Sequence, residues 1–310
     1  QKTRDPYRIW LSEIMLQQTQ VSTVIPYYAR FLASFPDVLA LAAAPIELVI
    51  AHWAGLGYYA RARNLHRCAQ QIAAVHGGKF PKTEAQLAEL PGIGRSTAAA
   101  IAAFAFGRRA AILDGNVKRV LCRQFGVEGF PGAKAVHDRL WDLAESLLPE
   151  GDIEVYTQGL MDLGATLCTR SRPRCADCPV TDNCVARRDG RQGDLPEAKP
   201  RAAIPERRST FVLLSDGYRL LLERRPPSGL WGGLLVPPEG DPADVAGRFG
   251  LALGPMTKLP SFRHAFTHFR LTLEPVLCQI DARFQAAEPG LEWVEIERAA
   301  DAGVPAPIKK

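Results

Sequence analysis

The sequence contains no long apolar run, and this absence excludes one class of protein at the outset. Across 310 residues, no stretch approaches the roughly 18 consecutive apolar residues that a membrane-spanning helix needs. Residues 1–7 carry charges and do not resemble a signal peptide. We therefore expect a soluble, cytoplasmic chain with no membrane partner. Because the chain opens on Gln1 without a methionine, we also expect that residues before it are missing.

Cysteine is sparse except in one short segment. Seven cysteines in an intracellular chain argue against a disulfide framework, and Cys68, Cys122 and Cys278 are scattered singly, as core residues would be. The other four fall within seventeen residues as Cys-x6-Cys-x2-Cys-x5-Cys, at Cys168, Cys175, Cys178 and Cys184. Zinc ribbons usually pair two knuckles across a long gap, whereas one compact run of four cysteines favours an iron–sulfur cube. We therefore expect a [4Fe-4S] cluster here, with zinc as the alternative.

The positive charge is concentrated in the first two thirds of the chain. The formal net charge is +5, and the basic excess lies within residues 1–208. Arg170, Arg172 and Arg174 lie between the first two clustered cysteines, in a loop that a metal would hold rigid. Such a loop suits the phosphates of a nucleic-acid backbone, although a solvated surface loop has the same composition.

The pattern divides the chain into two domains joined by a linker. Residues 1–186 show Ala- and Leu-rich stretches at three- and four-residue spacing and predict an all-α domain. Residues 187–208 lack apolar periodicity and are rich in Pro, Gly and charge, which is typical of a linker. Residues 209–310 predict an α+β domain with a hairpin of residues 210–214 and 219–223 and a strand over 271–280. The expected helices are Arg8–Gln18, Val21–Ser34, Ile46–Trp53, Ala60–His76, Glu84–Leu90, Ser96–Phe106, Asn116–Phe125, Ala133–Leu148 and Ile153–Leu163.

A glycine-rich turn between two predicted helices forms the second candidate site. Its paired glycines allow a tight turn that exposes amide N–H groups at a helix N-terminus, where an anion can bind. The residues of this candidate DNA-backbone contact are Pro91, Gly92, Ile93, Gly94, Arg95 and Ser96. A helix–turn–helix corner without a ligand is the alternative. Twenty residues beyond Gly94, Asp114 precedes the next helix, where it can be both an N-cap and a catalytic carboxylate.

A helix-hairpin-helix followed by an aspartate and a four-cysteine segment resembles the endonuclease III superfamily of DNA glycosylases. Two further segments, Trp10–Gln20 (WLSEIMLQQTQ) and Gly55–Asn64 (GLGYYARARN), closely resemble the MutY-type adenine DNA glycosylases. The resemblance implies an all-α helix-hairpin-helix glycosylase domain with an iron–sulfur cluster, followed by an α+β Nudix-like domain. It also implies that the enzyme flips out and removes adenine mispaired with 8-oxoguanine or guanine.

The chemistry of that reaction calls for two carboxyl groups with different pKa values. Departure of adenine needs a proton on the base and a negative charge beside the sugar cation. Glu13 shares a helix face with the apolar Ile9 and Trp10, so desolvation is expected to raise its pKa. The resemblance implies that Glu13 protonates adenine N7. Asp114, beside Asn116 and helix N–H donors, is expected to remain ionised and to stabilise the sugar cation.

The chain lacks a lysine nucleophile at the end of the hairpin, and this determines what is expected after the base departs. Bifunctional relatives carry a lysine nucleophile at the end of the hairpin, where this chain has Ser96. Serine cannot form a Schiff base with the sugar, so we expect a monofunctional glycosylase. Lys118, one helical turn beyond Asp114, is expected to contact the DNA backbone and could trap the abasic sugar fortuitously.

The resemblance also supplies candidate residues that read the lesion. Family positions that contact the flipped adenine or the opposite 8-oxoguanine are matched by Gln17, Gln18, Thr19, Leu56, Tyr58 and Gln158. In the Nudix-like domain, Phe266, Thr267 and His268 stand where Phe-Ser-His is usual, and threonine retains the hydroxyl. Residues 239–250 lack the glutamate-dense run that Nudix hydrolysis needs, so we expect this domain to bind without hydrolysing. A sheet edge with surface histidines is the alternative for residues 266–268.

We therefore expect a monomer that binds double-stranded DNA containing an adenine:8-oxoguanine mispair, located at the nucleoid if the source is bacterial. Three other functions fit parts of the pattern. A glycosylase of the same superfamily could remove thymine or uracil from mismatches, or oxidised pyrimidines. A non-catalytic iron–sulfur protein could sense damage, and a Nudix hydrolase could act on a nucleotide.

Overall fold

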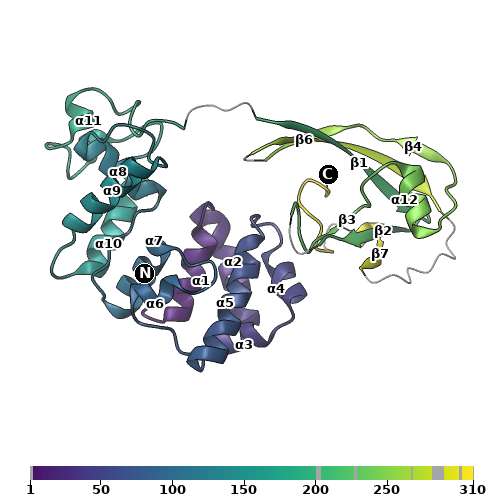
Figure 1. The fold of residues 1–310 in the computed structure, drawn as a ribbon, viewed down its shortest axis with the longest axis horizontal. Helices are drawn as coiled ribbons and strands as arrows, with labels where there is room; N and C mark the ends of the chain where they lie inside the picture. Colours follow the sequence, from purple (N-terminus) through teal and green to yellow (C-terminus); the bar gives the residue numbers. More distant parts are fainter. Residues whose placement is uncertain are drawn as a thin grey trace. The chain divides into compact units, whose positions relative to one another are not determined.

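The computed structural model describes residues 3–199, 204–226, 229–266, 268–280, 290–299 and 302–309. The chain forms two compact units (Figure 1). The first contains residues 1–43 and 64–201, and the second contains residues 44–63 and 202–310. No helix within the described ranges is long and apolar enough to cross a membrane.

The chain is helical up to Arg188, and the described residues of this part contain no strand. Helix α1 begins at Pro6 because the Asp5 side chain accepts a hydrogen bond from the amide of Tyr7, and it ends at Leu16, so Gln17 and Gln18 lie beyond it. The predicted bounds of α2, α4 and α5 are confirmed. The helices are α1 (Pro6–Leu16), α2 (Val21–Ser34), α3 (Val38–Ala43), α4 (Ile46–Trp53), α5 (Ala60–His76), α6 (Glu84–Ala88), α7 (Arg95–Phe106), α8 (Gly115–Phe125), α9 (Lys134–Ser146), α10 (Ile153–Asp162) and α11 (Val185–Arg188).

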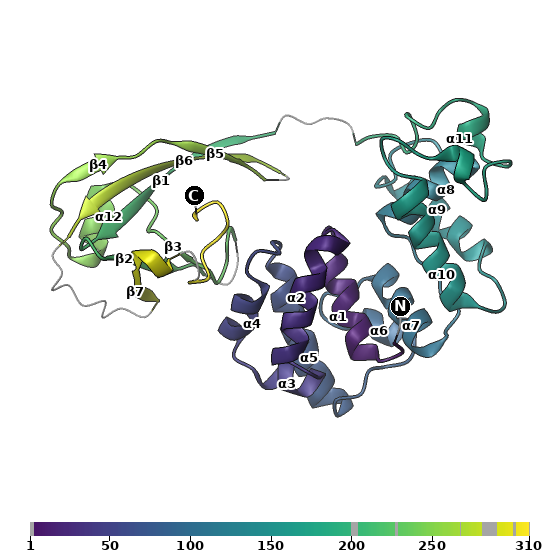
Figure 2. The ribbon, with the colours of Figure 1, turned by 180° about the vertical axis from the view of Figure 1, so that it is seen from behind.

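Helix α7 lies at the centre of the first unit. Its residues from Ala98 to Phe104 are all buried, so it is apolar on every side, as a helix enclosed by others must be. It packs against α1, α6 and α10, and it ends at Gly107, which adopts a left-handed φ of 62°. Figure 2 shows α8, α9 and α10 beside one another, consistent with the contacts of α8 with both of its neighbours.

Within its described residues, the second unit contains a seven-stranded mixed sheet with the order β3-β2-β1-β6-β4, in which β5 also pairs with β6 and β7 with β2. Strands β1 and β2 form the predicted antiparallel hairpin, with Leu214 opposite Leu221. Strands β1 and β6 run parallel. The strands are β1 (Glu206–Ser215), β2 (Arg219–Arg224), β3 (Leu235–Val236), β4 (Met256–Lys258), β5 (Phe262–Ala265), β6 (Arg270–Gln279) and β7 (Leu291–Glu295).

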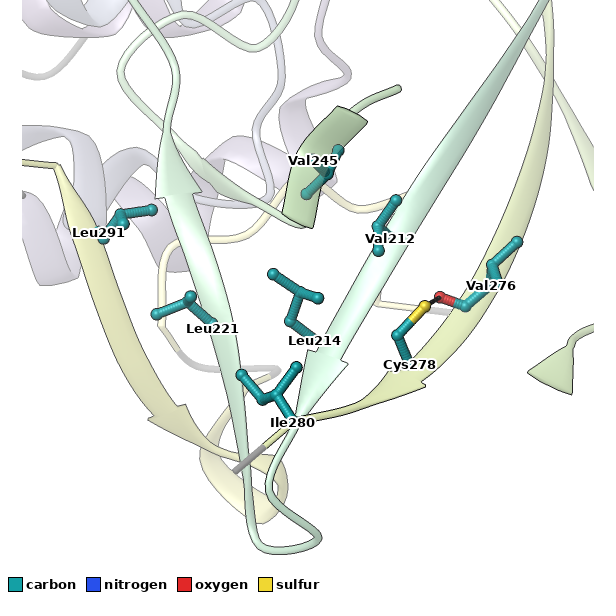
Figure 3. Close-up of a cluster of buried hydrophobic side chains, with 8 residues drawn as sticks. All are labelled: Val212, Leu214, Leu221, Val245, Val276, Cys278, Ile280 and Leu291. Carbon is teal, nitrogen blue, oxygen red and sulfur yellow. Dashed lines mark hydrogen bonds between the residues drawn. The ribbon is translucent and has the colours of Figure 1, made fainter. Parts of the chain in front are cut away.

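A hydrophobic core cluster of this unit lies between the sheet and helix α12 (Pro242–Phe249). Figure 3 shows Val245 of α12 directed toward the side chains of Val212 and Leu214 on β1. Cys278 of β6 belongs to the same cluster and is fully buried. Cys68 and Cys122 are fully buried in the first unit, so the prediction that these three cysteines pack in cores is confirmed.

The stretch of residues 187–208, predicted to be a linker, is only partly irregular. Arg187 and Arg188 belong to α11, and β1 begins at Glu206. Leu195 is buried, and its carbonyl accepts a hydrogen bond from Arg123 in the first unit. Composition does not reveal such contacts, because the side chain that binds the Leu195 carbonyl is distant in sequence.

Candidate functional site

The glycine-rich turn joins α6 to α7 as a helix-hairpin-helix. Gly92 adopts a left-handed φ of 79°, and a Cβ on it would lie 2.6 Å from Cβ of Asn64, so glycine is required there. Ile93 is buried and fastens the turn to the core. Gly94 is the N-cap of α7 and faces open space, and no side chain caps the helix. The first amides of α7 therefore lack helical partners, which suits an anion.

Arg95 supports this hairpin from the side. Its guanidinium lies 3.9 Å from the ring centroid of Trp141 and pairs with Glu84 and Glu145. These contacts tie the start of α7 to α6 and α9. Pro91 is half-buried in the same turn.

A hydrogen bond connects the hairpin to the candidate catalytic aspartate. The hydroxyl of Ser96 accepts from the amide of Leu113, at 2.9 Å. Asp114 follows, and one of its carboxylate oxygens caps α8 by accepting from the amide of Val117, at 2.7 Å. Its other oxygen accepts a long hydrogen bond of 3.5 Å from the amide group of Asn116. Asp114 is therefore an N-cap, as predicted, and it remains half-buried rather than enclosed. Lys118 continues the first turn of α8 and is also half-buried.

The end of α1 lies against the same hairpin. The amide group of Gln17 donates to the hydroxyl of Thr97, at 3.3 Å, and Thr97 is adjacent to Ser96 in α7. Gln18 follows with a left-handed φ of 56° and is exposed. Glu13, one turn before Gln17 on α1, is half-buried. The structure thus brings the end of α1, the hairpin and the segment before Asp114 into one connected group.

Helix α8 also holds the segment that leads to the cysteines. Arg119 donates to the carbonyls of Gly164 and Cys168, both at 2.7 Å, and to the side-chain oxygen of Asn116, at 2.9 Å. Burial lowers the pKa of Arg119, and its interactions with the neighbouring Cys168 and Asp114 oppose that shift. Arg123, one turn further along, donates to the carbonyls of residues 169, 170 and 195.

A short π-helix, Leu163–Leu167, lies in close contact with Asn116 in the first turn of α8. A Cβ added to Gly164 would lie 2.6 Å from Cβ of Asn116, so the two segments touch without room for a side chain. The π-helix ends directly before Cys168, whose thiol lies 3.4 Å from the guanidinium of Arg123. A single π-helical turn of this kind, here at the end of α10, interrupts the regular α-helical geometry before Cys168.

The four clustered cysteines line one small cavity together with Arg123 and Thr181. All four are half-buried free thiols. Among the described residues, no three His, Cys, Asp or Glu side chains converge closely enough to hold a single metal ion. Arg170 and Arg172, in the loop between the first two cysteines, are exposed.

A cleft of about 590 Å³ lies beside α10. Gln158 projects from this helix, and its amide group donates to Asp162 at 2.9 Å. Arg4 pairs with Glu154 at 2.9 Å across the same cleft. The lining residues are Thr3, Arg4, Phe104, Glu154, Val155, Gln158, Gly159 and Asp162.

In the second unit, two of the candidate lesion-reading residues, Phe266 and His268, lie between β5 and β6. The amide of Phe266 donates to the carbonyl of Phe269, at 2.9 Å. The Phe266 ring stacks on Phe269 at 4.6 Å and contacts Trp231 at 5.9 Å, which favours an anchoring role for Phe266. His268 is exposed. Thr267 lies outside the described residues.

Two acidic residues near α12 are engaged in structural contacts. Asp241 caps the helix by accepting from the amide of Ala243. Burial by itself raises the pKa of Glu239, but hydrogen bonds from Arg225 and Ser209 outweigh it and hold that pKa below its ordinary value.

Sequence reasoning did not single out Arg119 and Arg123, which bind the cysteine segment, or Arg4 and Glu154 in the cleft. The i, i+4 spacing of Arg119 and Arg123 places them on one helix face, and this was the available signal. Nothing local to Arg4 or Glu154 indicates that they pair, because 150 residues separate them.

Comparison with known proteins assigns the class. The model of the HhH-GPD superfamily of base excision DNA repair proteins matches residues 11–146, and a NUDIX domain model matches residues 209–310. The first match covers the candidate carboxylates and the hairpin. The second covers the mixed sheet and α12.

Relatives define the family more narrowly. The chain is 34% identical to the adenine DNA glycosylase of Buchnera aphidicola subsp. Schizaphis graminum, over 100% of this chain and 91% of that protein. It is 33% identical to the adenine DNA glycosylase of Homo sapiens, over 99% of this chain and 67% of that protein. A thermostable thymine-DNA glycosylase structure is similar with a TM-score of 0.56 and 32% identity, over 61% of this chain and 87% of that one. The chain belongs to the adenine DNA glycosylase family, as its motifs indicate.

Proposed function

We propose that this enzyme removes adenine paired with 8-oxoguanine, using Glu13 as the acid and Asp114 as the carboxylate that stabilises the sugar cation. One observation carries the proposal: hydrogen bonds join both carboxyl-bearing segments to the helix-hairpin-helix. The amide of Leu113, which precedes Asp114, donates to the hydroxyl of Ser96, and the side chain of Gln17 at the end of α1 donates to that of Thr97. The hairpin suits a DNA phosphate, so a bound strand is placed next to both carboxyl groups.

The two carboxyl groups occupy different surroundings, as acid and anion roles require. Glu13 is half-buried and lies one helical turn from Ile9 and Trp10, which are fully buried. Asp114 accepts hydrogen bonds from the amide of Val117 and from the side chain of Asn116. The cleft that Gln158 lines offers space and hydrogen-bonding groups for the extruded base.

Ser96 supports a monofunctional reaction. Its hydroxyl already accepts the amide of Leu113, so it supports the backbone before Asp114. A serine at this position supplies no amine for a Schiff base, and the product is expected to be an intact strand with an abasic site.

The cysteine segment fits a [4Fe-4S] cluster. The four free thiols Cys168, Cys175, Cys178 and Cys184 line one cavity. Four thiolates in one compact run are the ligand set of an iron–sulfur cluster, and zinc is the alternative that metal analysis would distinguish. When bound, the cluster would hold the loop that carries Arg170 and Arg172 in a fixed shape toward the DNA backbone.

The second unit is proposed to recognise 8-oxoguanine through Thr267 and His268. The rings of Phe266 and Phe269 stack on each other, and His268, which precedes Phe269, is exposed. Glu239 and Asp241 are engaged with Arg225 and the α12 amides, which supports binding without Nudix hydrolysis.

Replacing each carboxyl group tests the chemistry. In single-turnover excision from an adenine:8-oxoguanine duplex, Glu13→Gln and Asp114→Asn are each expected to lower the rate by about 10²–10⁴-fold, because the amides keep the shape but lose the proton or the charge. Glu150→Gln, at an exposed position, is the matched control. A Glu13→Gln rate within about threefold of wild type would show that another group protonates the base. A nick formed without base treatment would contradict the monofunctional assignment.

Metal analysis of a cysteine variant tests the cluster. The wild-type chain is expected to contain about four iron atoms, and Cys175→Ser is expected to lose them and to bind DNA more weakly. Cys278→Ser, in the core of the other unit, should retain the iron. Stoichiometric zinc would refute the cluster. A cluster-free variant that folds and binds DNA normally but cannot excise adenine would refute the supporting role.

Lesion reading is tested by comparing substrates. Thr267→Ala and His268→Ala are each expected to lower the preference for adenine opposite 8-oxoguanine over adenine opposite guanine by about two- to tenfold, the effect of one net hydrogen bond. Tyr218→Ala, an 85% exposed position in the same unit, is the control. Unchanged selectivity in both variants would eliminate these residues as readers.

A further inference from the structure

The turn between α4 and α5 holds an unusual backbone in place. Gly55 and Gly57 adopt φ values of 103° and 72°, and Tyr58 adopts 50°. A left-handed conformation is costly for tyrosine and persists only when its surroundings impose it. The Tyr58 side chain is nevertheless 51% exposed, so burial of its own ring does not impose the conformation.

Arg61 lies under this turn and contacts it at several points. It is only 9% exposed, and its guanidinium donates to the carbonyls of Leu56 and Gly57, each at 3.3 Å. The indole N–H of Trp53 donates to the same Gly57 carbonyl, at 3.1 Å. Carbonyls in an irregular turn are not satisfied by the regular hydrogen bonds of a helix or sheet. The side chains of Arg61 and Trp53 therefore fix the direction in which these carbonyls point.

The guanidinium also lies between two aromatic rings. Its central carbon is 5.3 Å from the ring centroid of Trp53, which is fully buried, and 5.6 Å from that of Tyr58. Burial lowers the pKa of Arg61 to about 10, and Tyr58 opposes the shift, so the side chain remains a cation at neutral pH. One buried cation thus joins the core, the turn backbone and the underside of the exposed ring.

We propose that Arg61 is a positioning residue for Tyr58: it fixes the Leu56–Tyr58 turn so that the tyrosine ring is held outward, ready to enter the duplex. The inference rests on the proposed function and on the family resemblance, which implies that Tyr58 inserts into the duplex beside the opposite 8-oxoguanine. Lysine cannot replace Arg61, because a single ammonium group neither spans two carbonyls in a plane nor stacks between two rings. Arg61 itself touches no reacting atom.

The test is a double-mutant cycle with two readouts. Single-turnover excision from the adenine:8-oxoguanine duplex is measured for wild type, Tyr58→Ala, Arg61→Lys and the double variant. Extrusion of the base is measured with 2-aminopurine placed at the adenine position, because its fluorescence rises as the base leaves the stack. Arg67→Lys, the same change six residues further along α5, is the control.

Tyr58→Ala and Arg61→Lys are each expected to lower the excision rate by about ten- to hundredfold, with a matching loss of the fluorescence change. The double variant should be no worse than Tyr58→Ala alone, because Arg61 acts through that ring. A target adenine in a pre-opened bubble should restore the rate of Arg61→Lys, which a general loss of folding would not allow.

Two results overturn the inference in distinguishable ways. If Tyr58→Ala leaves both readouts unchanged, the wedge role fails and the inference fails with it. If Tyr58→Ala is impaired but Arg61→Lys is not, or their effects are additive, only the role of Arg61 fails. Should Arg61→Lys not fold, Trp53→Phe removes the other donor to Gly57 while keeping a ring, and it must show the same loss of fluorescence change for the proposal to stand.

Discussion

The contact between α8 and the π-helix before Cys168 is the constraint on which the first unit depends. Gly164 allows the two backbones to touch, and Arg119 then bonds the carbonyls of residues 164 and 168. The same helix carries Asp114 at its N-terminus, five residues before Arg119. The cysteine segment is therefore attached to the element that places the proposed catalytic carboxylate. A cluster held by these cysteines, which we propose takes no part in bond breaking, would therefore still support activity.

Buried arginines organise the irregular backbone in both units. Arg123 is 3% exposed and bonds carbonyls of the cysteine segment and of residue 195. Arg61 does the same for the turn before α5. A guanidinium presents five donors in a rigid plane, so it can satisfy several carbonyls that no helix or strand satisfies. The segments proposed to meet DNA are thus irregular in backbone but fixed in shape.

Local signals predicted most of the fold. Apolar periodicity located the main helices, and the role of Asp114 as an N-cap followed from its place before α8. What could not be predicted depends on partners distant in sequence. Within the predicted linker, the carbonyl of Leu195 accepts a hydrogen bond from Arg123, 72 residues away. Phe266 matched a lesion-reading motif, yet its ring packs on Trp231, a contact that no periodicity reveals.

The most direct test of this account is the effect of one added methyl group on excision. A Cβ at Gly164 would lie 2.6 Å from Asn116 Cβ, so Gly164→Ala must shift one side of this contact, and we expect the start of α8, with Asp114, to be displaced. The account predicts a single-turnover rate lowered by about ten- to hundredfold. Gly151→Ala, where an added Cβ meets nothing within 4 Å, should leave the rate unchanged. A folded, iron-loaded Gly164→Ala variant with the wild-type rate would contradict the account.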